Sequence, residues 1–564
     1  MIKRAPQLLL WFVPLIFLGL FYFYPLSRIL TLSFSRAVSI WQPFVDVFGN
    51  ASFRGVLWFT FWQASLSTLL TLTLGLPAAY LLARFRFRGK AFLRALSAVP
   101  FVLPTLVVAT AFDSLLGPRG WVNLWLVSIF NLASPPIHFV NSLGAILVAH
   151  VFYNTTIVLR LVGDFWARLG PQIEQAASVL GASPRQVLTK VTLPMLAPAL
   201  SAATLLVFIF DFTSFGVILV LGGPRFSTLE TEIYYQTVAL FDLPVAATLA
   251  LVQLLITVAL TVIYTRLSAH VSRPQQLRAP QLGARAWAGR GKWLVNVFLA
   301  ALVLFFVSPL AALAGRSITR LGSDRGQITA SPGLTLDYYK ALAQTEGRDL
   351  FFAPPAQAIQ TSAVYAGFTI SLALFIGLPA AWVLARREKA ILSRILDPVL
   401  MLPLGTSAVT LGLGFLIGLD FPPLNLRASI LLVPLAHTLV ALPFVVRSLT
   451  PALRSIRPRL HQAAEILGAS PGRVIRHVDI PLVGRALMVA ALFAFAISIG
   501  EFGATALVAR PEFPTIPVLI FRLFSQPGDT TYGQAMALST ILMLVTAGGM
   551  LLIERFRVAD IGEF

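Results

Sequence analysis

The chain contains no cysteine, and only 12% of its 564 residues are charged. Without cysteine, no disulfide framework, thiol chemistry or cysteine-ligated metal site can form. The sequence also has no GxxxxGK[ST] phosphate loop, so this device for binding the phosphates of ATP is missing. No paired carboxylates, nucleophile–base pair or metal-ligand cluster stands out. We therefore expect that the chain is not an enzyme and that it holds no cofactor or metal.

The sequence is rich in apolar runs. Hydrophobic residues make up 57% of the chain, and runs of about 20 apolar residues, the length of a membrane-spanning helix, recur throughout. Because backbone polar groups must be satisfied inside lipid, such spans should be helices. We count about twelve, centred near residues 17, 70, 105, 152, 208, 254, 304, 372, 407, 438, 495 and 543. The predicted fold is an all-α polytopic membrane protein.

The net charge of +20 is unevenly placed along the chain. Basic residues gather in alternate connections, such as 84–94 and 266–292, and the connections between them are balanced or acidic. This is the positive-inside bias, which sets orientation in a bilayer. The charge therefore indicates a membrane topology and not nucleic-acid binding. With Arg4 and Arg555 on the basic side, we expect a multi-pass protein of the bacterial inner membrane with both termini in the cytoplasm.

The two halves of the sequence repeat each other. The segment "QAASVLGASPRQVLTKVTLP", from Gln175 to Pro194, recurs 287 residues later as "QAAEILGASPGRVIRHVDIP", with eleven of the twenty positions identical. Earlier, "GLPAAYLLAR" from Gly75 matches "GLPAAWVLAR" from Gly377. Each half is therefore predicted to hold six spans in the same orientation, as a parallel duplication. The predicted parts are a first domain at 1–265, a basic cytoplasmic linker at 266–292 and a second domain at 293–564.

Both copies of the long segment fall in cytoplasmic loops, at 164–196 and 449–483, which we call the first and second repeated loops. "QAASVLG" predicts a short helix that stops at Gly181, because glycine tolerates the left-handed backbone of a helix end. Ser183, Pro184 and Gln186 then supply the N-cap, first-turn proline and capping box of a second short helix. We expect Pro194 to end that helix. An ordinary amphipathic connection on the membrane surface explains one such loop but poorly explains two so similar.

The repeated loops resemble the cytoplasmic EAA loop of type I ABC-importer permeases, which carries a coupling helix that docks into a groove on the ATP-hydrolysing subunit. The resemblance covers essentially the whole chain. It implies a coupling role for Gln175, Ala176, Ala177, Gly181, Ser183, Pro194, Gln462, Ala463, Ala464, Gly468, Ser470 and Pro481. The glutamate that names the motif is glutamine in both copies. A hydrogen bond from glutamine, worth about 1 kcal/mol net, would replace only part of an ion pair to the ATPase.

This resemblance implies the permease subunit of an ATP-driven solute importer. ATP would be hydrolysed by a separate partner, and two loops on one chain would grip two ATPase subunits. Because the loops have similar sequences, we expect the two subunits to be identical. A periplasmic or lipid-anchored binding protein would deliver the solute.

Two carboxylates inside predicted spans are candidates for the translocation pathway. Asp211 and Glu501 lie on the fifth and eleventh spans, where an ionisable side chain costs about 2.5–3.5 kcal/mol on insertion scales. Glu501 aligns with Ser214, which lies one turn after Asp211 on the same helix face. The carboxylates therefore either line a shared anionic path for a cationic solute or form hydrogen bonds within the helix packing.

Two further equivalent pairs lie in the same spans or beside them. His150 and His437 occupy identical repeat positions, which favours a common structural hydrogen bond over a solute ligand. Phe215 and Phe502, each followed by glycine, either close a gate between the halves or contribute ordinary aromatic packing.

The cargo is suggested by a closer resemblance. "TSFGVILVLGGPRFSTLETEIYYQ" resembles thiamine-transporter permeases, and "SIGEFGATALVARPEFPTIPVLIF" is similar to both the thiamine and the ferric-iron branches. Both solutes are cationic, so the carboxylates do not separate them. We expect thiamine, with ferric iron as the alternative. An ion-coupled secondary transporter and a membrane scaffold or sensor are possible from other classes, but neither explains the paired loops.

Overall fold

The computed structural model describes residues 4–35, 39–169, 172–271, 285–286, 292–320, 333–343, 354–386, 391–420 and 426–556. Most of the predicted linker, at 272–284 and 287–291, lies outside the described residues. Helix α13 (Leu243–Val271) continues six residues beyond the predicted end of the first domain.

The first half is helical apart from one short strand. Its elements are α1 (Arg4–Leu18), η1 (Gly19–Phe23), α2 (Tyr24–Ser33), α3 (Gln42–Gly49), α4 (Ala51–Arg84), β1 (Phe85–Arg86), α5 (Lys90–Val102), α6 (Thr105–Leu116), α7 (Trp121–Phe130), α8 (Leu143–Arg168), α9 (Gln172–Val179), α10 (Pro184–Val187), η2 (Leu188–Thr192), α11 (Leu193–Phe212), η3 (Ile218–Gly222), α12 (Leu229–Val238) and α13.

The second half follows the same order. Its elements are β2 (Arg285–Ala286), which pairs in parallel with β1, then α14 (Lys292–Ser317), α15 (Asp337–Ala341), α16 (Pro355–Arg386), α17 (Ile391–Met401), η5 (Leu402–Gly405), α18 (Ala408–Gly418), η6 (Leu426–Ala428), α19 (Leu432–Ser455), α20 (Pro458–Ile466), α21 (Pro471–Val474), η7 (Ile475–Asp479), α22 (Ile480–Gly500), α23 (Thr505–Val508), α24 (Ile516–Phe524) and α25 (Asp529–Phe556).

The predicted number of spans agrees with the helices in the described residues. Ten helices are long and apolar enough to cross a membrane, and two bent helix pairs raise the number to as many as twelve. The bent pairs are α5 with α6–α7, at 111°, and α17–η5 with α18, at 99°. They are the third and ninth spans. Pro104 lies in the first break, and Pro403 lies in η5, just before the second. Proline lacks the backbone N–H of a continuous helix, which explains why these two spans break.

The duplication extends to individual hydrogen bonds. The hydroxyl of Thr60 in α4 accepts from the backbone N–H of Leu229 at 3.0 Å, at the start of α12. In the second half, Ser362 in α16 accepts from the N–H of Ile516 at 2.8 Å, at the start of α24. In both halves the second span thus satisfies a buried N–H group that has no partner within its own helix, at the start of the same short helix. Matching residues hold matching elements in place.

The two halves are interlocked. Helix α1 packs against α16 of the second half, and α14 packs against α6 of the first. Tyr22 in η1 shares a 2.6 Å hydrogen bond with Thr406, and the indole of Trp121 donates to the carbonyl of Ala312 at 3.1 Å. The first span of each half therefore rests on the opposite half.

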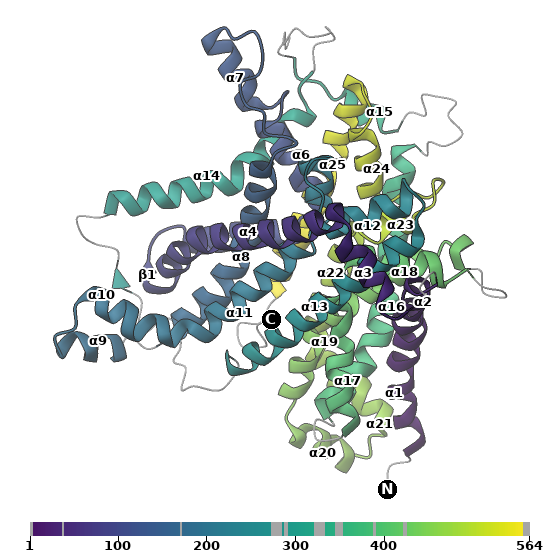
Figure 1. The fold of residues 1–564 in the computed structure, drawn as a ribbon. Helices are drawn as coiled ribbons and strands as arrows, with labels where there is room; N and C mark the ends of the chain where they lie inside the picture. Colours follow the sequence, from purple (N-terminus) through teal and green to yellow (C-terminus); the bar gives the residue numbers. More distant parts are fainter. Residues whose placement is uncertain are drawn as a thin grey trace.

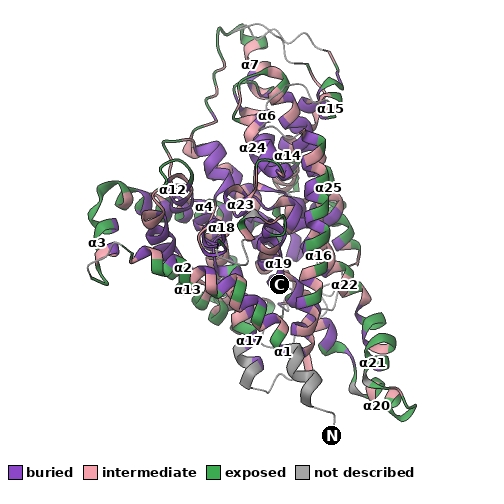
Figure 2. Ribbon diagram, turned by 90° about the vertical axis from the view of Figure 1, so that its right-hand side faces the viewer, coloured by how far each residue is buried: buried purple, intermediate pink, exposed green. Residues whose placement is uncertain are grey.

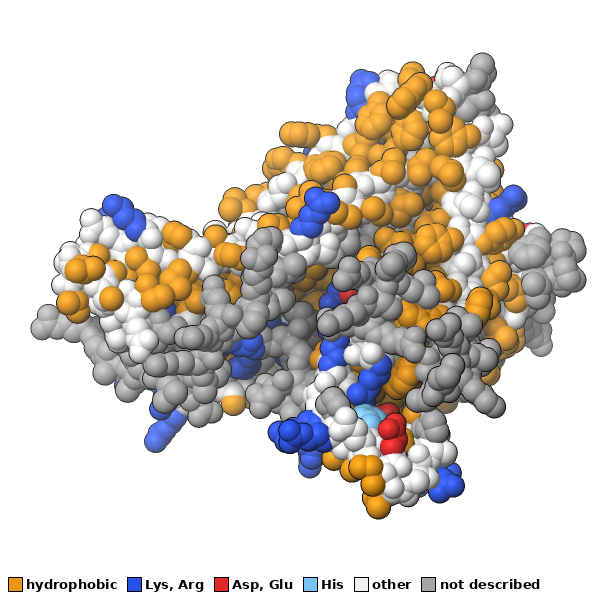
Figure 3. Space-filling view, turned by 90° about the horizontal axis from the view of Figure 1, so that it is seen from below, with side chains coloured by type: hydrophobic (Ala, Val, Ile, Leu, Met, Phe, Trp, Pro, Cys, Tyr) orange, Lys and Arg blue, Asp and Glu red, His pale blue; other side chains and the backbone are white. Residues whose placement is uncertain are grey.

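The remaining helices form two arms that diverge from a common centre. Figure 1 shows α4, α8 and α11 running together in one arm and α16, α19 and α22 in the other, with α9–α10 and α20–α21 at the far ends. Buried residues concentrate where the arms meet, whereas α3, α20 and α21 at the periphery are largely exposed (Figure 2). Seen from below, basic side chains are spread over the described part of the face and acidic ones are scarce (Figure 3).

Candidate functional site

Each repeated loop is a pair of short helices joined at a left-handed glycine. Gly181 has φ +86° and Gly468 has φ +76°. After the turn, the N–H of Ala182 bonds the carbonyl of Ala177, and the N–H of Ala469 bonds that of Ala464, both at 3.0 Å. These bonds, which reach from beyond the glycine to the last helical turn, satisfy carbonyls that the helix end leaves free. The predicted turn is confirmed in both copies.

The second short helix of the first loop begins as predicted. Ser183 and Gln186 form a capping box, in which the Ser183 N–H donates to the Gln186 side chain at 2.8 Å and the Gln186 N–H donates to the serine hydroxyl at 3.4 Å. Pro184 occupies the first turn. In the second loop Pro471 likewise opens α21, but Arg473 stands where the box would need glutamine.

The predicted ending of this helix at proline is wrong. Residues 184–212 form one helical span, as do 472–500, and Pro194 and Pro481 lie inside them. A π-helical turn precedes each proline, at η2 and η7, and each proline falls in the first turn of the α-helix that follows. The wider turn relieves the clash and the lost hydrogen bond that proline causes within an α-helix. Each repeated loop is thus continuous with the fifth span of its half.

The tip of each repeated loop is apolar and open to solvent. Val179 and Leu180 are each 87% exposed, and their equivalents Ile466 and Leu467 are 86% and 87% exposed. Helix α9 has no buried residue. Isolated exposed apolar residues are ordinary, but two adjacent ones kept at the same place in both copies indicate a contact surface.

The base of each repeated loop is fixed by the arginine that ends the second span. Arg84 contacts the Glu174 carboxylate at 2.5 Å, and Thr192 donates to the same carboxylate at 2.9 Å. In the second half Arg386 lies 3.0 Å from His461 and 3.3 Å from Asp479, and those two are 2.7 Å apart. His461 stands at the position of Glu174, and Asp479 at that of Thr192. The acid has changed position, but the arginine retains an acidic partner.

His150 joins three spans of the first half. Its Nδ1 lies 3.0 Å from the Ser67 hydroxyl of α4 and 3.3 Å from the Asp211 carboxylate of α11. Its Nε2 lies 2.8 Å from the hydroxyl of Ser214. Asn154 donates to the same carboxylate at 2.7 Å. All of these contacts lie within the first half, and Asp211 is fully buried.

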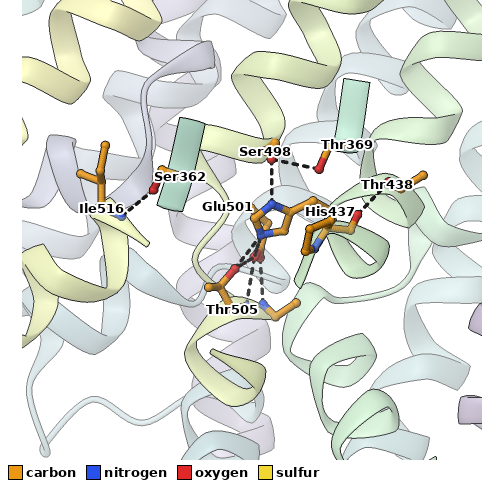
Figure 4. A network of polar contacts seen from close by, with 10 residues as sticks. Ser362, Thr369, His437, Thr438, Ser498, Glu501, Thr505 and Ile516 are labelled. Atoms are coloured by element: carbon orange, nitrogen blue, oxygen red, sulfur yellow. Dashed lines mark hydrogen bonds and ion pairs between the residues drawn. The ribbon is translucent and has the colours of Figure 1, made fainter. Parts of the chain in front are cut away.

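His437 occupies the same place in the second half, at the centre of the network in Figure 4. Its ring nitrogens lie 2.8 Å from the Ser498 and Thr505 hydroxyls, and its Nε2 is 3.4 Å from Glu501. The Glu501 carboxylate also accepts from the N–H groups of Ala504 and Thr505, at 2.8 and 3.0 Å. Ser498 donates to Thr369, the equivalent of Ser67.

The acid and the serine hydroxyl occupy swapped positions in the two histidine networks. Asp211 aligns with Ser498 and Ser214 with Glu501, so each histidine contacts one acid and one serine, one turn apart, in opposite order. The contacts of both carboxylates remain within their own half. This arrangement agrees with the interpretation of hydrogen-bonded residues in the helix packing, and it differs from a carboxylate pair lining one path. It also agrees with the predicted structural role of the histidines.

Beside the two histidine networks, the halves meet through aromatic rings. Phe215 and Phe502 stack with ring centroids 5.4 Å apart and planes 21° apart, and both are buried. Phe215 also packs on Tyr234 at 5.3 Å, and Phe502 packs on Phe521 at 5.5 Å. Tyr234 and Phe521 are equivalent at the offset of 287, so the four rings have the symmetry of the duplication. We call them the aromatic cluster.

The glycines that follow the two stacked rings allow this approach. A Cβ at Gly216 would lie 2.3 Å from the Thr105 hydroxyl and 3.2 Å from the Phe502 ring. A Cβ at Gly503 would lie 2.9 Å from that of Ala408. Thr105 and Ala408 open the helices that follow the two breaks, so the aromatic cluster is held against both broken spans.

Comparison with known proteins identifies the family. The model of a family described as "Binding-protein-dependent transport system inner membrane component" matches twice, over residues 72–273 and 373–556. The chain belongs to this family. Each match contains one repeated loop and one histidine with its acid, so the duplication consists of two permease domains.

Relatives match the chain over nearly its full length. The thiamine transport system permease protein ThiP of Haemophilus influenzae is 29% identical, over 96% of this chain and 95% of that protein. The proteins of that name from Salmonella typhimurium and Escherichia coli K12 are 26% and 27% identical, over 98% and 90% of this chain and 98% and 88% of their own. The chain is therefore a fused, multi-pass inner-membrane permease subunit of an ABC importer.

Sequence reasoning missed two features of this permease. Arg84 and Arg386 end the repeated segment "GLPAA…LAR", and that repetition was the signal that could have pointed to them. Glu230 lies in one of the balanced or acidic connections between predicted spans, but it is fully buried in α12. The Thr228 N-cap and the apolar residues around it, which start a helix and bury it, were the available signal.

The changed position of the acid at the loop base makes a compensation test possible. Glu174→His alone leaves Arg84 without its acid. Because a hydrogen bond to a charged group contributes about 1.5–3 kcal/mol, trypsin should cleave the first repeated loop at Arg185 about ten times faster. Adding Thr192→Asp recreates the second-half arrangement and should restore the slow rate. Cleavage of the second loop at Arg473 is the internal control, and a double variant cut as fast as the single would contradict the assigned contacts.

Proposed function

We propose that this permease forms the translocation pathway for thiamine in an ATP-driven importer. The observation that carries the choice of cargo is the likeness to relatives named as thiamine transport permeases, which extends over both domains and up to 98% of the chain. A shared loop alone would point only to the family. Likeness along the whole length includes the spans and the aromatic cluster, where a solute must pass.

The ATPase partner is inferred from the structure of the two repeated loops. Each repeated loop presents an exposed apolar tip and is continuous with a span that ends at the aromatic cluster, and each has its base fixed to the second span by an arginine. Movement of an ATPase subunit at the tip is thereby passed along α11 or α22 to the contact between the halves. We assign one copy of the same ATPase to each loop, because Val179–Leu180 and Ile466–Leu467 offer nearly the same side chains.

The remaining assignments concern topology and delivery. Both termini lie in the cytoplasm with the repeated loops, which agrees with the basic character of that face. The outer segments receive a periplasmic or lipid-anchored binding protein that carries the solute. Within the repeated loops, the twelve residues named from the family motif transmit the ATPase movement. Phe215 and Phe502 close the pathway, and Asp211, Ser214, Glu501, His150 and His437 hold the helices that carry those rings.

Uptake decides the cargo. Cells lacking their own thiamine and ferric-iron importers would express this chain with its genomic neighbours and be offered labelled thiamine or labelled ferric iron. Accumulation of thiamine that depends on ATP and on the chain supports the proposal. Accumulation of iron alone would retain the ABC permease and overturn thiamine as its cargo. Uptake driven by an ion gradient without the ATPase would overturn the mechanism.

A further inference from the structure

Glu230 is a fully buried carboxylate whose partners come from both halves of the permease. It lies in the first turn of α12. The Gln253 amide of α13 donates to one carboxylate oxygen at 2.5 Å, and the Ser407 hydroxyl donates to the other at 2.6 Å. Ser407 belongs to the second half and is the N-cap of α18, directly after the break in the ninth span. This hydrogen bond therefore joins the first half to the broken span of the second.

The Glu230–Ser407 contact borders the aromatic cluster. Tyr234 lies one turn after Glu230 on the same face of α12, and it packs on Phe215. On the other side, Ala408 follows Ser407 and lies against Gly503, the neighbour of Phe502. The carboxylate, the two stacked rings and the helix start after the break thus form one closed circuit of contacts. Glu230 is therefore joined, through α12 and through Ser407, to the elements that hold both stacked rings.

Glu230 has only neutral partners. None of the ion pairs among the described residues includes it. In this respect it differs from Asp211 and Glu501, each of which lies beside a histidine. Its equivalent at the offset of 287 is Pro517, so the second half has no matching acid. Burying a carboxylate without a cationic partner is costly, and a cation that arrives with the cargo would lower that cost.

We propose that Glu230 recognises the positive charge of the cargo at the aromatic cluster, and that its hydrogen bond to Ser407 is a latch of the closed pathway. The proposal rests on the proposed import of an organic cation. When the halves separate, the Glu230–Ser407 bond breaks and the carboxylate loses one of its two donors. A cation can then bind between the carboxylate and the exposed ring faces, which attract cations through their π electrons.

The arrangement gives cargo charge a role in the transport cycle. While the pathway is closed, Ser407 satisfies the carboxylate, so no solute is needed. While it is open, the cation replaces Ser407, and closure around the cation is opposed until the solute moves on. A neutral solute of the same shape gains nothing from this exchange.

The charge can be removed while the hydrogen bonds are kept. Among the residues that the structure describes, the buried side-chain oxygen of Gln253 has no hydrogen-bond partner. A glutamine at 230 can accept from Ser407 and donate to that oxygen once the Gln253 amide rotates. Glu230→Gln thus changes the charge and keeps the shape, and Glu230→Asp retains the charge. Glu232→Gln removes a carboxylate from a different face of the same helix turn.

The test is thiamine uptake by cells that express the chain with its ATPase and binding protein. We expect Glu230→Gln to lower thiamine uptake at least tenfold. Uptake by Glu230→Asp should remain within about threefold of the wild-type rate, and uptake by Glu232→Gln should equal the wild-type rate. Membrane level and the amount of co-purifying ATPase show whether each variant is assembled. Wild-type uptake by an assembled Glu230→Gln variant, or equal losses with glutamine and aspartate, would overturn the proposal. If wild type takes up a different cation, thiamine is wrong, and the same variants are compared with that cation.

The latch is tested separately with Ser407→Ala. Loss of the Glu230–Ser407 hydrogen bond should raise the rate of ATP hydrolysis, measured without cargo, about fivefold. Ser142→Ala is the matched control, because Ser142 is likewise an N-cap, at the start of α8, and its hydrogen bonds among the described residues stay within the first half. Equal ATPase rates in the two variants would overturn the latch.

Discussion

Replacing Gly181 and Gly468 together with leucine is expected to reduce ATP-driven uptake at least tenfold. Both glycines have positive φ, which costs a residue with a side chain roughly 1–2 kcal/mol. A Cβ at either position meets nothing within 4 Å, so the penalty comes from the backbone alone. The short helices must then change their turn and move the apolar tips away from the ATPase. Uptake and ATP hydrolysis, measured on the same membranes, show whether hydrolysis continues without transport.

Two controls separate backbone strain from bulk. Gly472→Leu places the same side chain in open space of the second repeated loop, where φ is not positive, and should leave uptake near wild type. Asparagine tolerates the left-handed conformation far better than leucine. The Gly181→Asn plus Gly468→Asn variant should therefore retain most of the transport. Coupled transport by the double leucine variant at the normal rate would show that the repeated loops do not transmit the ATPase movement.

The elements that sequence could predict are those set by local chemistry. The number of spans, the turns at Gly181 and Gly468, and the capping box of Ser183 all depend on residues close together in the chain. The continuation of the helix through Pro194 could not be predicted from the sequence. It depends on a π-helical turn of five ordinary residues, Leu188–Thr192, which accommodates the proline. No composition rule marks such a turn.

Contacts between distant segments were harder to predict. The histidine pair at equal positions pointed to a shared structural role, since equivalent residues in a duplication take equivalent partners. The exchange of acid and serine between Asp211–Ser214 and Ser498–Glu501 was visible in the alignment of the halves. Its meaning required the position of the histidine between the two sites, which only the packed helices provide. The crossing of α1 and α14 onto the opposite halves depends on tertiary packing and has no local signal.

The two halves share their basic and capping residues but differ in the positions of their acidic residues. Arginine, histidine and the capping hydroxyls remain in place, while the acids beside them have moved to neighbouring positions. Each moved acid still contacts the same basic residue, so the change is compensated. Glu230 is the exception, because proline stands at its equivalent and no compensating acid appears. An acid that is present in only one half distinguishes a residue proposed to bind cargo from the residues that hold both halves together.

Joining positions 215 and 502 covalently is expected to stop transport completely. The two rings stack across the boundary between the halves, so a cysteine at each position can be bridged by a short thiol-reactive reagent. The chain contains no cysteine, so the Phe215→Cys plus Phe502→Cys variant needs no other substitution and any bridge can only join these two. A pathway that opens by parting the rings cannot open while they are tied. Reductive cleavage of the bridge should restore the rate, and each single cysteine variant should be insensitive to the reagent. A bridged protein that still transports would place the pathway elsewhere than between Phe215 and Phe502.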